Sequence, residues 1–219
     1  MDKMNRRSKL GNEILGKSLH LKNGMQILPL MATTIEYGTH LKARVDPYIV
    51  GVGPVEAAMN TARVMQQCEK APDYALLLGS SGSASLQQGE IYQAKSVSYR
   101  DMDASAIGFE KGLTPFVDLP AALELAPQFD FIPKATLSTG GKVIVGDEFE
   151  QLSAEMVDME TFAVKRVCQS FDVPLIALRG ISDGKKELQQ FNDWTELLPL
   201  LDEKLAKLVD GIIEALETS

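Results

Sequence analysis

The sequence predicts a single α/β domain with a central mixed, twisted β-sheet flanked by helices. Short apolar runs of strand length alternate along the chain with segments of helical periodicity. The 219 residues, 45% hydrophobic and 24% charged, suit one domain with a sizeable core. The sequence contains no internal repeat and no linker rich enough in Gly, Ser or Pro to divide it.

The domain is expected to span residues 25–219. Residues 1–24 are basic and polar and lack the apolar segment of a secretory signal, which predicts a flexible leader or extended start; a targeting peptide is the alternative. The first strand is expected at residues 25–32, followed by a polar turn at 33–40. Residues 44–53 then lead into a helix at 55–67, whose expected buried side carries Val55, Met59, Ala62 and Met65.

Three more strands are expected in the middle of the chain. Residues 73–79 form an apolar run that ends in the small-residue loop SSGSAS, and residues 90–101 alternate like a strand with one solvated face. Residues 134–146 predict a strand interrupted by a glycine pair.

The C-terminal third predicts a helix, a buried strand and a covering helix. Residues 157–184 contain a helical stripe and then the apolar run VPLIALRGIS. Residues 193–219 begin with a capping-box pattern and carry apolar residues at helical spacing. The capping pair is Asp193 and Glu196, and the apolar positions are Leu197, Leu198, Leu201, Leu205, Leu208 and Ile212.

Composition restricts the partners and the compartment. The net charge of −8 and the pI near 4.9 argue against nucleic-acid and anionic-membrane partners, and no apolar run approaches the ~18 residues of a membrane span. Cys68 and Cys168 are expected in the core, with a disulfide or a zinc site shared with His20 and His40 as the alternatives. This cysteine usage predicts a reducing, cytoplasmic compartment.

Charged residues occupy unusual positions between residues 157 and 184. Glu160 shares the apolar helix face, while Arg179 and Asp183 end a strand apolar enough to be buried on both sides. Two glycine loops, VGVGPVEAA and LLLGSSGSAS, follow predicted strands but match neither a dinucleotide fingerprint nor a P-loop. They are either packing turns or a site for a neutral polyhydroxylated ligand at the strand ends.

These stretches resemble the purine nucleoside phosphorylase/nucleosidase superfamily, and within it the 5′-methylthioadenosine/S-adenosylhomocysteine nucleosidases. The resemblance rests on VDMETFAVKRVCQSFDVPLIALRGISD together with ATTIEYG, VGVGPVEAA, GSSGS, YRDMDASAIGF and, more loosely, STGGKVI. It implies a nucleoside phosphorylase-like fold and hydrolysis of the N-glycosidic bond of an adenine nucleoside, with no metal or organic cofactor. A phosphorylase using phosphate and a catalytically inactive nucleoside-binding module are the alternatives.

The resemblance assigns Asp183 as the acid that protonates N7 of the purine, with Ser182 orienting it and Arg179 setting the charge balance. Glu160 matches the carboxylate that binds the ribose 2′- and 3′-hydroxyls and favours a cationic sugar; alternatively it is a first-turn acid favoured by the helix dipole. Met159 would pack against the sugar. Asp158 is expected to be a helix N-cap.

The resemblance also assigns Glu36 as the acid that deprotonates the attacking water; taken alone, it reads as a solvated loop acid. Leu77 stands where some relatives carry a phosphate-binding arginine, which favours hydrolysis. Softer assignments to the sugar and base are Val52, Ser80, Ser81 and Gly82, and, as a stacking wall or else core strand residues, Val143 and Ile144.

The segment YRDMDASAIGFEKGLTPF resembles a family segment at a two-fold interface, where it reaches into the neighbour's 5′-substituent pocket. A homodimer is therefore expected, with Ile107 reaching the neighbour's pocket. The alternative is a loop folded onto its own domain.

Overall fold

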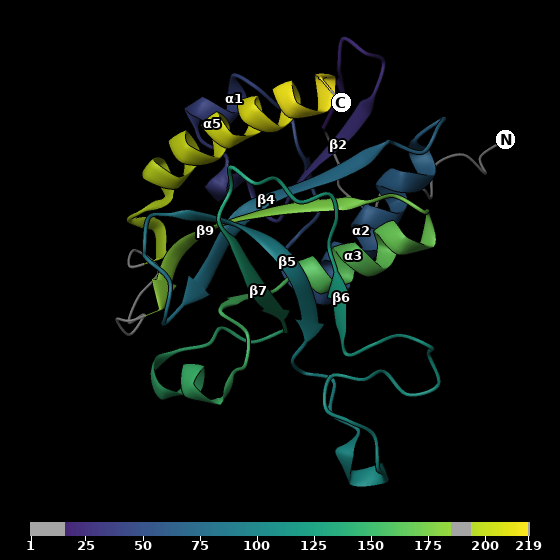
Figure 1. Cartoon of the computed structure of the whole chain (residues 1–219), viewed down its shortest axis with the longest axis vertical. Helices are drawn as coiled ribbons and strands as arrows, with labels where there is room; N and C mark the ends of the chain where they lie inside the picture. The colour runs from purple at the N-terminus through teal and green to yellow at the C-terminus, as the bar shows by residue number, and fades with distance from the viewer. Residues whose placement is uncertain (1–15, 185–193, 219) are drawn as a thin grey trace, which may run out of the picture.

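A strongly twisted mixed sheet forms the centre of the computed structural model, which describes residues 16–184 and 194–218 (Figure 1). Strands β2, β4 and β9 run parallel, while β5 runs antiparallel to β9 and parallel to β7. Because β7 also pairs with β8, and β8 with β4, the ring β4–β9–β5–β7–β8 closes on itself. Among the described residues the strands are β1 (Leu19–His20), β2 (Gln26–Met31), β3 (Tyr48–Ile49), β4 (Tyr74–Ser83), β5 (Ile91–Tyr99), β6 (Ala122–Glu124), β7 (Lys134–Thr139), β8 (Met156–Asp158) and β9 (Leu175–Gly184).

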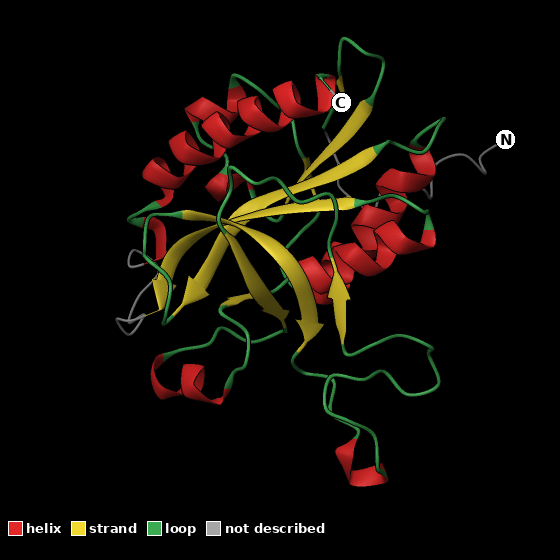
Figure 2. Cartoon of the chain, in the orientation of Figure 1, coloured by secondary structure: helices red, strands yellow, loops and turns green. Residues whose placement is uncertain are grey.

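Helices cover both sides of this sheet (Figure 2). Helices α2 (Pro54–Gln67) and α3 (Thr161–Ser170) lie together on one side, while α5 (Leu198–Glu217) and the short α1 (Thr39–Lys42) lie on the other. Each helical layer seals its own apolar core against the sheet, one with Val64 and Val164 and the other with Leu201 and Leu205. The predicted fold class, one domain with a mixed sheet flanked by helices, is confirmed.

The C-terminal elements follow the sequence pattern closely. Every residue of β9 is buried, as its apolar run predicts for a strand covered on both faces. Helix α5 buries Leu198, Leu201, Leu205 and Ile212 at the predicted spacing. Asp193 of the expected capping box lies outside the described residues, and α5 begins at Leu198, with a proline in its first turn.

The buried side predicted for α2 is wrong in its first two turns, although Met65 is buried as expected. Val55 and Met59 are 76% and 46% exposed, whereas Ala57, Thr61 and Val64 face the core. Helix α2 packs against α3, and Ala57 and Val64 belong to the apolar core that the two helices share. The rotation leaves an apolar stripe on the surface of α2.

Three expected boundaries also change. Residues 16–24, expected to belong to a leader, contribute β1, which pairs antiparallel with β2. The SSGS segment is part of β4 and not a loop, because β9 pairs with it along its length. Residues 140–146 leave the sheet, because β7 ends at Thr139. The amide of Gly140 donates to the Asp158 carbonyl. Val143 and Ile144 are therefore loop residues.

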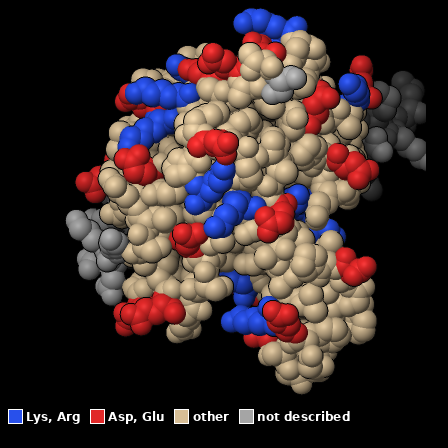
Figure 3. Space-filling view, in the orientation of Figure 1, with Lys and Arg blue, Asp and Glu red and all other residues tan. Residues whose placement is uncertain are grey.

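The surface and the cysteines agree with the composition. Lys and Arg lie among Asp and Glu on the face shown in Figure 3. Cys168 is buried and Cys68 half-buried, and both are free thiols. Across residues 16–184 and 194–218, no helix is long and apolar enough to cross a membrane.

Candidate active site

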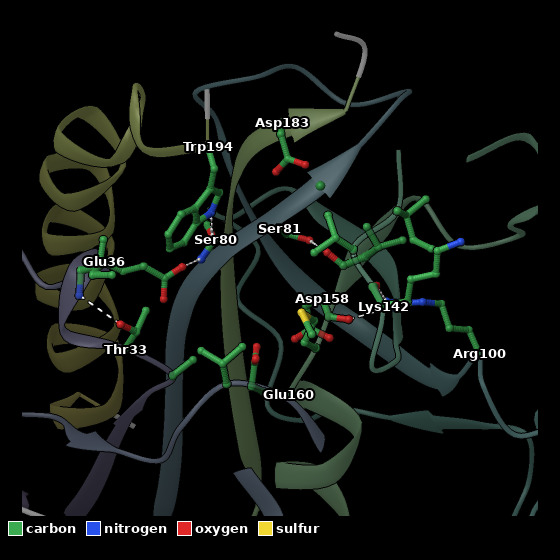
Figure 4. Close-up of a pocket in the computed structure, with 18 residues that line it drawn as sticks. Thr33, Glu36, Ser80, Ser81, Arg100, Lys142, Asp158, Glu160, Asp183 and Trp194 are labelled. Atoms are coloured by element: carbon green, nitrogen blue, oxygen red, sulfur yellow. Dashed lines mark hydrogen bonds between the residues drawn. The ribbon is translucent and has the colours of Figure 1, made fainter. Parts of the chain in front are cut away.

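A cavity of about 550 Å³ lies where several strands end and the loops after them begin (Figure 4). Its walls come from β2, β4, β5, β7, β8 and β9 or from the residues directly after them, which is the usual ligand position in such sheets. The sequence-predicted residues that line it are Glu36, Val52, Ser80, Ser81, Gly82, Val143, Ile144, Met159, Glu160 and Asp183.

Asp183 presents its carboxylate to the cavity near the end of β9. Its side chain accepts a 2.6 Å hydrogen bond from the Ser182 hydroxyl. Burial raises the pKa of Asp183, and the Ser182 bond opposes that shift in part. A Cβ atom at position 82 would lie 3.0 Å from Asp183 Oδ2, so glycine there leaves room for the carboxylate. Ser182 is itself buried and does not line the cavity.

Glu160 occupies the N-cap position of α3, and its carboxylate faces the cavity. Oε1 accepts a 3.0 Å hydrogen bond from the amide of Gly53, which has a φ of 93° that favours glycine. Burial raises the pKa of Glu160 to about 7, with a further contribution from Asp158, while Arg179 and the Gly53 amide oppose the shift. Glu160 was expected on the buried face of the helix, but it lies one residue before α3 begins. Its carboxylate therefore faces the cavity and not the core.

A buried ion pair lies next to the Glu160 carboxylate. Arg179, 1% exposed, pairs with Asp158 and lies 3.8 Å from Glu160 Oε2. Asp158 also accepts hydrogen bonds from the hydroxyl of Thr139 and from the amide of Thr161, a capping bond to α3. Asp158 therefore caps the helix through its side chain, although Glu160 holds the N-cap position. Arg179, which the resemblance grouped with the substrate-binding residues and expected to set the charge balance, does not line the cavity.

Glu36 lies in the 3₁₀ helix η1 (Thr34–Glu36), on the side of the cavity opposite Arg100 and Lys142. It is 8% exposed, and its Oε1 accepts a 2.8 Å hydrogen bond from the amide of Ser80. The position is thus buried and fixed, unlike that of a solvated loop acid. A side chain at Gly79 would overlap the Arg179 guanidinium and approach Glu36, which explains the glycine before the serine pair.

Trp194 is a cavity residue that the sequence analysis missed. Its indole Nε1 donates a 3.0 Å hydrogen bond to the Ser80 hydroxyl, which places the ring beside Glu36 (Figure 4). Arg100 and Lys142 also line the cavity and were missed, as was Thr33. Thr33, Arg100 and Lys142 lie in the quoted stretches ATTIEYG, YRDMDASAIGF and STGGKVI, which was a signal that could have found them. The signal for Trp194 was that it is the only tryptophan in the chain.

Ile107 does not reach this cavity within its own chain. It lies in η2 (Ser105–Ile107), on a segment that projects beyond the sheet, and is 71% exposed. Phe116 on the same projection is 94% exposed. The alternative of a loop folded onto its own domain is therefore not what the structure shows.

The three carboxyl groups of Asp183, Glu160 and Glu36 give the cavity acid–base chemistry. A carboxyl group with a raised pKa serves as a proton donor, and two further buried carboxylates can bind hydroxyls, activate water or stabilise a cation. Among the residues that the structure describes, no cluster of three or more His, Cys, Asp or Glu could hold a metal ion. The fold and site define an α/β protein with an acid–base pocket for a small, hydroxyl-bearing ligand.

The chain belongs to the phosphorylase superfamily, whose family model matches residues 32–214. It is similar to the 5′-methylthioadenosine/S-adenosylhomocysteine nucleosidase of Haemophilus influenzae (strain PittGG), with 30% identity over 76% of this chain and 79% of the relative. It is also similar to the nucleosidase of the same name from Glaesserella parasuis serovar 5 (strain SH0165), with 32% identity over 73% of this chain and 76% of the relative.

Solved structures share the fold at lower identity. A 5′-methylthioadenosine/S-adenosylhomocysteine nucleosidase of Helicobacter pylori, complexed with a substituted pyrrolidin-3-ol, superposes with a TM-score of 0.75 and 19% identity, covering 86% of this chain and 97% of the other. A futalosine hydrolase mutant of Helicobacter pylori strain 26695 also has a TM-score of 0.75 and 19% identity, covering 86% and 98%.

Proposed function

We propose that this protein is a purine nucleosidase that hydrolyses the N-glycosidic bond of an adenine nucleoside, such as 5′-methylthioadenosine or S-adenosylhomocysteine, and releases the free base. The names of its relatives support the reaction. The observation that carries the proposal is the convergence of Asp183, Glu160 and Glu36 on one cavity.

Asp183 acts as the general acid on the leaving base. Cleavage of the bond leaves negative charge on the purine, and a proton delivered to N7 removes that charge. A carboxyl with an ordinary pKa would be ionised at neutral pH, but burial raises the pKa of Asp183 and so favours the protonated form. Ser182 fixes the direction in which the carboxyl points.

Glu160 binds the ribose hydroxyls and stabilises the sugar as it becomes cationic. The bond from the Gly53 amide holds one carboxylate oxygen, and the other lies 3.8 Å from Arg179. A negative charge in a buried site attracts the oxocarbenium-like transition state more than the neutral substrate, which is the differential binding that accelerates a reaction.

Glu36 activates the attacking water, and the charge around it favours water over phosphate. The cationic side chains on the described part of the cavity wall are Arg100 and Lys142, and both lie on the side opposite Glu36 (Figure 4). The Arg100 guanidinium donates to backbone carbonyls, and Lys142 pairs with Glu148. Among the described residues that line the cavity, no cation beside Glu36 is therefore available to a phosphate ion, and the nearby buried Arg179 is paired with Asp158.

The proposal extends to a cytoplasmic homodimer that acts in methionine salvage. The apolar surface on α2 (Val55 and Met59) and the exposed Ile107 and Phe116 support association, because exposed apolar patches commonly mark interfaces. Figure 3 shows few charges on the lobe formed by the projecting segment. The resemblance places this segment at a neighbour's pocket, where Ile107 would complete the 5′-substituent site.

The test is to incubate the purified protein with 5′-methylthioadenosine, with and without phosphate, and to analyse both products. We expect adenine and 5-methylthioribose at a rate that phosphate does not change. A sugar 1-phosphate formed only with phosphate would establish a phosphorylase instead. Binding of the nucleoside without any cleavage would establish a binding module.

A further inference from the structure

Arg100 is an unusual buried arginine, because backbone carbonyls and not carboxylates accept its short hydrogen bonds. Its Nη1 donates to the carbonyls of Ser138 and Asp158 at 2.7 and 2.8 Å. Its Nη2 donates to the carbonyl of Gly140 at 3.3 Å and to that of Lys142. The side chain is only 7% exposed, and the nearest carboxylate pairing is with Asp101 at 3.9 Å.

These four carbonyls belong to separate segments, of which Lys142 and Asp158 line the cavity. Ser138 lies in β7, and Gly140 and Lys142 lie in the loop that continues to Val143 and Ile144. Asp158 ends β8, directly before Met159 and Glu160. One planar guanidinium therefore joins the wall that carries Val143 and Ile144 to the strand end that carries the ribose carboxylate. The flat fork of an arginine suits several acceptors at once, which a lysine ammonium cannot reproduce.

The loop has few other attachments of its own. The Gly140 amide donates to the Asp158 carbonyl at 3.1 Å, and the Gly141 amide donates to Asp101. A Cβ atom at position 140 would lie 2.7 Å from Arg100 Nε, so glycine there permits the close approach. Val143 is 53% exposed and so adds little packing that would fix the loop, although Ile144 next to it is buried.

We propose that Arg100 is a positioning residue that holds the base-binding loop, residues 140–144, in its binding-competent place against β8. The assignment of this loop to the base rests on the proposed function. Asp183 and Glu160 have their own supports in Ser182 and Gly53, so they keep their positions without Arg100. Loss of Arg100 therefore weakens base binding and raises KM, while kcat changes little.

The first test needs no ligand. Trypsin cleaves after Lys142, whose side chain is 64% exposed and whose carbonyl is bound by Arg100. In Arg100→Met we expect cleavage at Lys142 to accelerate about tenfold or more, because cleavage follows the population of the open loop. Cleavage at Lys111, exposed on the projecting segment, should stay the same. Unchanged cleavage at Lys142 would overturn the proposal, whatever the substrate of the protein.

The second test separates positioning from a general loss of stability. Trp194 is the only tryptophan of the chain and lines the cavity, so its fluorescence reports titrations with adenine and with 5-methylthioribose. If Arg100→Met leaves the loop in place in a tenth of the molecules, the apparent affinity for adenine falls about tenfold. The affinity for 5-methylthioribose should stay within about threefold, because the sugar contacts persist.

Two further variants complete the comparison. Arg100→Lys keeps the charge and can reach one carbonyl, so an intermediate adenine affinity is expected; it also replaces Arg100→Met in both tests if that variant does not fold. Arg166→Met is the matched control, since Arg166 is half-buried and bonds Gln169 outside the cavity. Equal losses for adenine and 5-methylthioribose, or adenine binding equal to that of the unchanged protein, would overturn the proposal. A parent protein that binds neither ligand would contradict the proposed function. The proteolysis result would still decide whether Arg100 holds the loop at residues 140–144 in place.

Discussion

Glu160→Gln should make the stability of the protein less sensitive to pH. Glu160 is 6% exposed, and its pKa rises from the ordinary 4.5 to about 7 in the folded chain. Between these two values the native state binds more protons than the unfolded state, so the free energy of unfolding falls as the pH rises. A shift of roughly 2.5 units at ~1.36 kcal/mol each amounts to about 3 kcal/mol of stability, which is fully present below pH 4.5 and lost once the pH exceeds 7. Glutamine does not ionise, so Glu160→Gln does not lose this stability as the pH rises.

Urea unfolding of both proteins at pH 5 and pH 8 measures the effect. The stability of Glu160→Gln relative to the parent should increase by about 2–3 kcal/mol from pH 5 to pH 8. A relative stability that stays constant across this range would refute the placement of Glu160 as a buried, pKa-shifted carboxylate. Activity gives a second view, because kcat/KM of the parent should rise with pH as a group near 7 ionises. The variant should lack this rise and turn over ribosides poorly.

Three further predictions concern the other carboxylates and the assembly. Asp183→Asn keeps the shape and the Ser182 bond but cannot deliver a proton, so kcat should fall by ~10²–10⁴, and a variant within threefold of the parent would contradict the acid role. Glu36→Gln can still accept from the Ser80 amide, so the protein should fold normally and bind adenine while hydrolysis falls ~10²-fold or more; steady-state rates near those of the parent would remove Glu36 from the mechanism. Ile107→Asp should split the homodimer and lower activity together, as light scattering and assay would show, and a fully active monomer would exclude a shared site.

Much of the site was predictable because its chemistry resides in short, local motifs. Glu36, Glu160 and Asp183 each stand beside a strand end or helix start that the apolar pattern defines, and parallel strands bring such ends to one edge. The misplacement of Glu160 by one residue had little effect. Its carboxylate was expected on a buried surface, and the N-cap position buries it equally well.

What the sequence could not predict depends on packing between distant segments. The buried side of α2 was wrong at Val55, which stays exposed while Ala57 and Val64 join the core shared with α3. The roles of Arg179 and Arg100 could not be predicted either. Each side chain donates to hydrogen-bond acceptors from several elements, and no local sequence pattern indicates that these elements meet. Trp194 lies far along the chain from its partner Ser80, so its place in the cavity follows only from the fold.

The origin of the new oxygen on the sugar tests the central claim most directly. When 5′-methylthioadenosine is cleaved in H₂¹⁸O with phosphate present, mass spectrometry of the sugar product, taken before the label at its anomeric carbon exchanges with solvent, measures that origin. If Glu36 directs water onto the cation that Glu160 stabilises, the product is free 5-methylthioribose carrying one ¹⁸O. A sugar phosphate without the label, or recovery of the intact nucleoside, would contradict hydrolysis by this cavity.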